Sequence, residues 1–335
     1  MSQSTRVAVA ELETLVAGSM MSANVSEANA AAIARALVLA EIDGLKGHGL
    51  SRIDSYCEQA RTGKADGHAD PVISRTKPGS LMIDVRHGFA YQALEQATEI
   101  LPGMARECGI AAAGLVRSHH AGALGQAAER LATSGMLALM FANTPHAMTA
   151  WGGRRPLFGT NPVAFAAPRR NAFPVVVDLA LSEVARGKIL SAAQKGEAIP
   201  EGWAKDADGN PTTDAKAALK GTLEPAGGAK GAALAFMVEV LAASLVGANQ
   251  SFEASSFFDG EGKPPAVGQF IIAIDPGAFA GSDAFADRME KLAAAIDDGS
   301  GARLPGSRKP HLRAAAARDG VPVGDDLLAK LKPAS

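Results

Sequence analysis

Apolar residues in the first part of the chain recur with helical spacing. Residues 7–16 carry valines and leucines near the 3.6-residue period and predict a first helix. An Ala-rich second helix is predicted over 26–41, and a third, shorter one over 52–61 that ends at a Thr-Gly pair. The Gly-rich stretch 43–49 separates the second helix from the third and predicts irregular backbone there.

Beyond this part, the hydrophobic pattern alternates between extended and helical periods. The alternation predicts a layered α/β fold in which helices flank a mixed sheet. Strands or extended segments are expected at 71–85, 110–116, 137–143, 175–178 and 270–275, and helices at 91–108, 122–134, from 178 through 195, 231–248, 284–298 and 322–332, with a polar loop at 200–214.

Charge and composition exclude several classes of protein. The chain has 335 residues, with 33 Lys+Arg against 35 Asp+Glu, so a nucleic-acid-binding surface is not expected. The longest apolar run, 231–248, contains Glu239 and predicts a buried helix rather than a membrane span. Only Cys57 and Cys108 occur, and the N-terminus lacks the apolar core of a signal peptide. We therefore expect a cytoplasmic protein without membrane contact, and its length favours two lobes.

The common cofactor and metal motifs do not occur in this sequence. No G-x-G-x-x-G follows a strand and no G-x-x-x-x-G-K-[ST] is found, so neither a Rossmann turn nor a P-loop is predicted. No H-E-x-x-H or C-x-x-C is present, and we expect no metal site.

A histidine between two glycines is the first candidate for chemistry. His48 lies between Gly47 and Gly49, and an imidazole can give or take one proton near neutral pH. Arg52 follows four residues later and could face the same side to bind a carboxylate. The alternative reading is an exposed histidine in a turn.

Three further clusters combine glycine with polar or basic residues. Residues 118–122 (Ser-His-His-Ala-Gly) join a strand to a helix, where a nicotinamide or phosphate could bind, although capping or core histidines are an equal alternative. Loops at 143–148, 151–155 and 159–162 suggest a shaped site. Residues 225–231 open the long apolar helix, where the glycines and Lys230 could form an anion-binding site or simply a helix start with a solvated lysine.

Four arginines, Arg154, Arg155, Arg169 and Arg170, lie in or near these loops. They are solvated surface charges, or one of them holds a 2′-phosphate.

Taken together, these stretches resemble the type-2 malate/L-lactate dehydrogenase family. That family includes sulfolactate and ureidoglycolate dehydrogenases and the Δ1-piperideine/Δ1-pyrroline-2-carboxylate reductases. The resemblance runs from about residue 39 to 305. It rests on Asp43-Gly44 through His48-Gly49 and Arg52, Ser118–Gly122, Asn143-Thr144, Trp151–Gly153, Gly159–Pro162, Asp178–Ser182, Gly202-Trp203, Asp208–Asp214, Gly227–Gly231 and Leu304–Gly306.

The resemblance implies an NAD(P)-dependent oxidoreductase with a non-Rossmann nucleotide-binding fold, usually a homodimer. The resemblance leaves NAD or NADP open, and the arginines near the candidate loops favour NADP slightly. It implies a catalytic-side helical domain of residues 1–115 with 266–335 and an NAD(P)-binding domain of 116–265. It makes His48 the proton donor and acceptor, and places Arg52 and Thr160 at the substrate. The cofactor would be bound by His120, Ala121, Gly122, Ala123, Leu124, Gly125, Asp178, Leu179, Ala180, Lys230, Arg303, Gly306 and Lys309.

Two positions depart from the family pattern. Many relatives have a serine where this chain has Gly47, and the imino-acid reductases carry an aspartate where it has Lys188. A relay through serine and aspartate is therefore missing. Because the hydroxy-acid branch of the family tolerates lysine at position 188, the resemblance favours a small 2-hydroxy/2-oxo acid of the malate, lactate or sulfolactate type as substrate. The alternatives are reduction of a cyclic imino acid and a non-catalytic homologue that only binds a dinucleotide.

Overall fold

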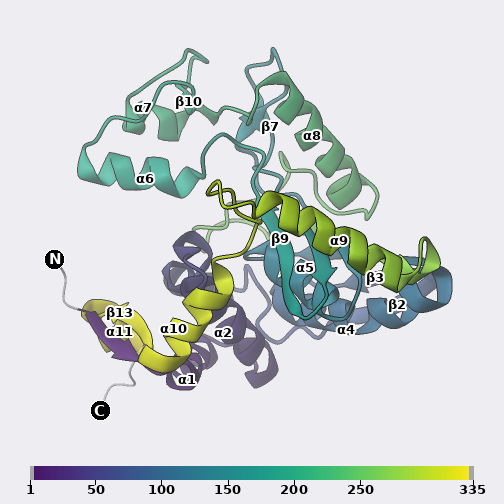
Figure 1. The fold of residues 1–335 in the computed structure, drawn as a ribbon. Coiled ribbons are helices and arrows are strands. Elements are labelled where there is room, and N and C mark those ends of the chain that lie inside the picture. The colour runs from purple at the N-terminus through teal and green to yellow at the C-terminus, as the bar shows by residue number, and fades with distance from the viewer. Residues whose placement is uncertain (1–3, 332–335) are drawn as a thin grey trace.

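A computed structural model describes residues 4–331 of the chain (Figure 1). The helices are α1 (Val9–Met21), α2 (Glu27–Ile42), α3 (Ile53–Thr62), α4 (Ala90–Cys108), α5 (Leu124–Thr133), α6 (Arg186–Lys195), α7 (Ala215–Lys220), α8 (Ala229–Glu239), α9 (Ser282–Ile296), α10 (Lys309–Asp319) and α11 (Asp325–Leu331). The strands are β1 (Ser4–Val7), β2 (Val72–Lys77), β3 (Ser80–Asp84), β4 (Ile110–Ser118), β5 (Leu137–Ala142), β6 (Met148–Thr149), β7 (Pro156–Phe158), β8 (Val163–Arg169), β9 (Ala172–Leu179), β10 (Ala204–Lys205), β11 (Thr222–Leu223), β12 (Val267–Ile274) and β13 (Val321–Gly324).

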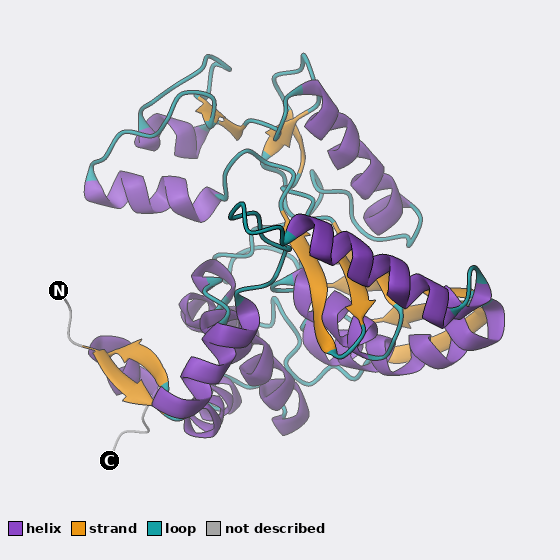
Figure 2. Cartoon of the chain, viewed as in Figure 1, coloured by secondary structure: helices purple, strands orange, loops and turns teal. Residues whose placement is uncertain are grey.

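The main sheet has seven strands in the order β2-β3-β4-β12-β5-β8-β9. Only the β3–β4 pair is parallel, so the sheet is mixed, as predicted. Side chains of the central strand β12 alternate between its two faces: Ile271 and Ala273 pack in the core under α4 and α5, whereas Phe270 and Ile272 pack toward α8. In Figure 2 the orange strands of this sheet lie behind α9, with further helices beyond them.

A second core joins the two ends of the chain. Helices α1, α2 and α3 pack with α11 and with the ribbon in which β1 pairs antiparallel to β13 (Figure 1). The predicted last helix, 322–332, is partly wrong, because residues 321–324 form β13 and the helix begins at Asp325. β13 pairs with β1, more than 300 positions away in the sequence, so the local sequence pattern does not indicate a strand there.

A third core lies around α6, α7, α8 and the small sheet β10-β11-β6-β7. The apolar run 231–248, predicted to be a buried helix, forms α8 and then a π-helical turn, η3 (Val240–Ser244). The prediction of burial is wrong for one face. That face leaves Phe236 59% and Leu245 58% exposed, because the helix packs on the sheet with its other side only.

The predicted division at residues 115/116 falls inside β4, and the seven-stranded sheet takes strands from both sides of it. The two-domain division stays a prediction. Among residues 4–331, no helix is long and apolar enough to cross a membrane.

Candidate active site

Two short 3-10 turns carry the first candidate cluster. η1 (Lys46–His48) and η2 (Leu50–Arg52) lie between α2 and α3. They are held against the end of α2, where Glu41 Oε2 accepts a hydrogen bond from Leu50 N at 3.2 Å. A Cβ on Gly49 would lie 3.0 Å from the backbone nitrogen of Glu41, so only glycine allows this close packing.

The guanidinium of Arg52 is oriented from two sides. Its Nε donates a hydrogen bond to the carbonyl oxygen of Gly47 at 2.7 Å, and its Cζ lies 4.6 Å from the ring centroid of Phe258. Its Nη1 is buried and has no hydrogen-bond partner in the described chain. An oriented guanidinium with one free, buried donor fits a carboxylate ligand.

His48 is close to a second histidine. Its ring stacks on that of His120, with centroids 5.3 Å apart and planes inclined by 16°. Within residues 4–331 its buried Nδ1 has no partner. Burial, and then the charge of Arg52, lower the pKa of His48 to about 4, so the imidazole is neutral at pH 7.

The structure separates the two histidines that follow β4. His119 is a core residue: it is 1% exposed, its Nε2 lies 2.6 Å from Gln59 Oε1, and its ring packs against Phe89. His120 instead lies beside His48. The core reading therefore holds for His119, whereas the binding reading of His120 stays a prediction.

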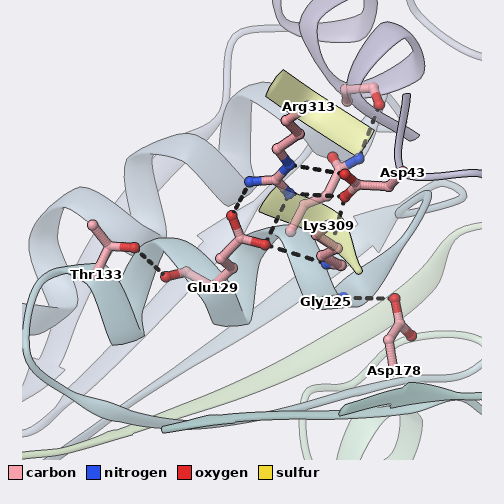
Figure 3. A network of polar contacts seen from close by, with 9 residues as sticks. Asp43, Gly125, Glu129, Thr133, Asp178, Lys309 and Arg313 are labelled. Atoms are coloured by element: carbon pink, nitrogen blue, oxygen red, sulfur yellow. Dashed lines mark hydrogen bonds and ion pairs between the residues drawn. The ribbon is translucent and has the colours of Figure 1, made fainter. Parts of the chain in front are cut away.

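Three segments that are distant in the sequence meet at the start of α5. Gly125 N donates a hydrogen bond to Asp178 Oδ2 at 2.8 Å (Figure 3). A Cβ on Gly125 would lie 3.0 Å from the side chain of Asp178, and one on Gly306, whose φ is +81°, would lie 3.1 Å from Val176. Both glycines thus allow close approach of backbone at the predicted cofactor-binding residues.

A cluster of four charged residues lies next to this meeting point (Figure 3). Arg313 donates two hydrogen bonds of 2.8 Å to Asp43 and also contacts Glu129. Lys309 Nζ lies 3.2 Å from Glu129 Oε2 and 3.5 Å from Asp43 Oδ2. The side chain of Asp43 is completely buried. The cluster ties the end of α2 to α5 and α10, and Lys309 is already paired with two carboxylates.

A series of hydrogen bonds joins Thr160 to two segments that lie next to other predicted residues. Thr160 N donates to Thr144 Oγ1 at 3.0 Å, Leu181 N to Thr160 O at 2.8 Å, and Ala226 N to Leu181 O at 2.9 Å. Leu179 and Ala180 immediately precede Leu181, and Lys230 is an exposed residue in the first turn of α8, four positions after Ala226.

The predicted site residues thus fall into separate groups. Across residues 4–331, no hydrogen bond or ring contact joins Thr160 or Lys230 to His48. The four residues between His120 and Gly125 (Ala121 to Leu124) are buried, whereas Arg303 is exposed. The described residues contain no group of three or more metal-binding side chains.

Three of the four candidate arginines contact other side chains, and Arg154 is exposed. Arg169 is paired with Glu290 at 2.6 Å and Arg170 with Asp287 at 2.7 Å, both on α9. Arg155 lies over the ring of Phe252 at 5.7 Å.

Three aromatic residues at this site, Tyr56, Tyr91 and Phe258, were not predicted from the sequence. Tyr56 Oη lies 2.9 Å from Tyr91 Oη and 2.5 Å from His120 Nδ1. The chain has only two tyrosines, and both are buried here. The small number of tyrosines was the one feature of the sequence that could have drawn attention to these residues. Nothing in the sequence links position 91 to position 120.

Comparison with known proteins finds similar proteins over nearly the whole length of the chain. A family model described as malate/L-lactate dehydrogenase matches residues 7–332. A (2R)-3-sulfolactate dehydrogenase (NADP(+)) of Chromohalobacter salexigens is 48% identical over 313 residues, 92% of each chain. A Δ1-pyrroline-2-carboxylate/Δ1-piperideine-2-carboxylate reductase of Pseudomonas putida is 41% identical over 332 residues, 98% of this chain and 96% of the relative. The crystal structure of Δ1-piperideine-2-carboxylate reductase from Pseudomonas syringae pvar. tomato matches with a TM-score of 0.92 and 37% identity, covering 98% of both chains.

Proposed function

The chain belongs to the malate/L-lactate dehydrogenase family, and from that premise we propose that it transfers a hydride between NADP and C2 of a small 2-hydroxy/2-oxo acid of the sulfolactate type. The observation that carries this proposal is the pair formed by Arg52 and His48. Arg52 presents a buried Nη1 with no partner among the described residues, and His48 presents a neutral imidazole whose Nδ1 is likewise without a partner. Together they provide a carboxylate ligand and a proton-transfer group.

In the proposed reaction, the nicotinamide supplies or takes up the hydride when it is bound. Arg52 holds the C1 carboxylate of the substrate, which fixes the reacting carbon in place. During oxidation, neutral His48 takes the proton of the C2 hydroxyl; during reduction, protonated His48 gives a proton to the C2 oxygen. Burial lowers the pKa of His48 most and the charge of Arg52 lowers it further. A carboxylate at Arg52 offsets this second effect, so bound substrate shifts His48 toward the protonated form that reduction needs. Thr160 is proposed to line the substrate.

The cofactor is proposed to lie along His120 to Gly125, Asp178 to Ala180, Lys230 and the segment from Arg303 to Lys309. The close glycine packing at Gly125 and Gly306 supports this placement, because a Cβ at either position would push the segments apart. NADP is favoured over NAD because the 48% identical relative is named for NADP(+), and because the exposed Lys230 and Arg303 are cations that suit an additional phosphate.

A homodimer is also proposed. The exposed face of α8, η3 and the residue after η3 carries Leu234, Phe236, Met237, Val240 and Leu245, each between 39% and 59% exposed. Neighbouring apolar side chains of this size are typical of an association surface. The expected cytoplasmic location remains a prediction; the free thiols of Cys57 and Cys108 are consistent with a reducing compartment.

Reduction of a cyclic imino acid is the second candidate function. It is favoured by the 41% identical relative and by the fold match to the piperideine-2-carboxylate reductase. A cyclic imine with a C2 carboxylate would use the same arginine and the same proton donor. Against it stands Lys188, an exposed residue of α6 where the imino-acid reductases are expected to have an aspartate.

A substrate panel tests the proposal. Oxidation of NADPH and of NADH would be followed with sulfopyruvate, oxaloacetate, pyruvate, Δ1-pyrroline-2-carboxylate and Δ1-piperideine-2-carboxylate. The proposal expects the highest kcat/KM with NADPH and an acyclic 2-oxo acid. Turnover of the cyclic imines alone would replace it with the second candidate. Binding of NADPH without turnover of any compound would point to a non-catalytic homologue.

A further inference from the structure

Tyr56 and Tyr91 form a hydrogen-bonded chain that ends on the histidine next to His48. Tyr56 Oη lies 2.9 Å from Tyr91 Oη and 2.5 Å from Nδ1 of His120. Tyr56 is fully buried, and Tyr91 and His120 are 5% and 6% exposed. Burial raises the pKa of Tyr56 to about 12 and that of Tyr91 well above its usual value, so both phenols keep their protons.

The direction of these hydrogen bonds follows from counting protons. In the described part of the chain, Tyr56 is the only hydrogen-bond partner of Tyr91 Oη. If Tyr91 did not donate to Tyr56, its buried hydrogen would be unsatisfied, which costs about 1–3 kcal/mol. Tyr56 therefore accepts from Tyr91 and donates its own hydrogen to Nδ1 of His120.

A histidine that accepts at Nδ1 carries its proton on Nε2. Burial lowers the pKa of His120 far below its usual value, which excludes the doubly protonated ring at neutral pH. Within residues 4–331, Nε2 makes no hydrogen bond. This N–H is thus a free donor on a ring that stacks on His48.

We propose that Tyr56, which accepts a hydrogen bond from Tyr91, is a positioning residue that fixes His120 as the Nε2–H tautomer, so that His120 presents a neutral hydrogen-bond donor to an oxygen of the bound substrate or cofactor. This inference rests on the proposed function of the His48 site. In this proposal the two histidines have different roles. His48 exchanges a proton with the substrate, whereas His120 donates a hydrogen bond and keeps its proton.

The tautomer can be measured directly in the cofactor-free protein. The chain has seven histidines, so ¹⁵N-histidine labelling gives few ring signals, and a His120→Gln variant assigns those of His120. At pH 7 we expect an unprotonated Nδ1 and a protonated Nε2. A protonated Nδ1, or a cationic ring, would overturn the proposal. This result does not depend on turnover, so it stands apart from any failure of the proposed function.

Two matched variants test whether the Tyr91–Tyr56–His120 hydrogen bonds affect the reaction. Tyr56→Phe removes the donor to Nδ1, and His120 should become a mixture of tautomers. The kcat of the Tyr56→Phe variant should fall roughly 10- to 100-fold, as when other residues that orient an active-site side chain are lost. Its Kd for NADPH should stay within about twofold of wild type. Tyr91→Phe leaves the Tyr56–His120 bond in place and should keep the Nε2–H tautomer and most of kcat.

A purely structural role would give a different pattern. In that case both variants would lower the Tm, and kcat would be unchanged or fall equally in the two folded proteins. Wild-type kcat and tautomer in a folded Tyr56→Phe variant would refute the positioning role. Should no substrate turn over in the wild type, the ¹⁵N spectra of the two variants still decide whether Tyr56 sets the tautomer.

Discussion

The carbonyl oxygen of Gly47 accepts a hydrogen bond from Nε of Arg52 at 2.7 Å. The residue before His48 therefore orients the proposed carboxylate ligand through its backbone. A Cβ on Gly47 would meet no atom within 4 Å, so this contact does not require glycine. The serine expected at this position in relatives would fit without disturbing Arg52.

Replacing Arg52 by alanine should mainly weaken substrate use. The variant loses charge-assisted hydrogen bonds worth about 1.5–3 kcal/mol, which corresponds to a loss of roughly 10- to 100-fold in kcat/KM. Most of this should appear as a higher KM for the 2-oxo acid, with the KM for NADPH unchanged. Steady-state kinetics with each substrate varied in turn would check it. Arg318→Ala, an exposed change on α10, is the control, and an unaltered substrate KM in Arg52→Ala would count against the assigned role.

Replacing His48 by alanine should lower kcat while NADPH still binds. Loss of a positioned proton-transfer group costs about 10²- to 10⁴-fold in rate. Because His48 contacts His120 only through ring stacking, the rest of the site should keep its shape. Fluorescence titration with NADPH, alongside kcat, separates the two effects. His311→Gln is a suitable exposed control. Near wild-type kcat in His48→Ala would remove His48 from the mechanism.

The pH dependence of the reaction should report the environment of His48. Its pKa in the free protein is lowered to about 4 by burial and by Arg52. A bound carboxylate offsets the charge of Arg52, so the pKa seen in kcat should lie above the one seen in kcat/KM. Oxidation needs the neutral ring and should speed up as pH rises through this pKa, whereas reduction needs the protonated ring and should slow down. Identical apparent pKa values in both parameters would argue that Arg52 does not bind the carboxylate.

The sequence predicted the parts of the fold that depend on local pattern. The helices near 26–41 and 91–108 and the apolar strands 110–116 and 137–143 correspond to α2, α4, β4 and β5. The β1–β13 ribbon could not be predicted, because its partners lie at opposite ends of the chain. The exposure of Phe236 was also missed, since a hydrophobic run does not reveal which of its faces will be covered.

The candidate site shows the same limit. Local spacing linked His48 to Arg52, because both belong to one short segment. It could not distinguish His119 from His120, whose roles depend on Gln59 and Tyr56 in α3. Nor could it show that Lys309 is paired with Asp43 and Glu129, which come from two other helical regions. Such contacts arise only when the packed elements bring distant residues together.

The buried carboxylate of Asp43 leads to a prediction for stability. Its side chain is completely buried and receives two hydrogen bonds from Arg313. Arg313→Ala leaves that charge with only Lys309 Nζ, at 3.5 Å. Removing one partner of a buried ion pair costs about 3–5 kcal/mol, and the remaining lysine should hold the loss near the lower value. Urea unfolding would measure it.

The arrangement also predicts how that loss can be reversed. Adding Asp43→Asn to Arg313→Ala removes the uncompensated charge, so the double variant should be more stable than Arg313→Ala alone. Arg318→Ala serves as the control, because its ion pair with Asp319 lies on the surface and should leave the free energy of unfolding unchanged. If Arg313→Ala unfolds at the wild-type urea concentration, or if Asp43→Asn adds a further loss, the cluster does not stabilise the protein through its charges. The expected recovery would instead establish that Arg313 serves chiefly to compensate Asp43, at the junction of α2, α5 and α10.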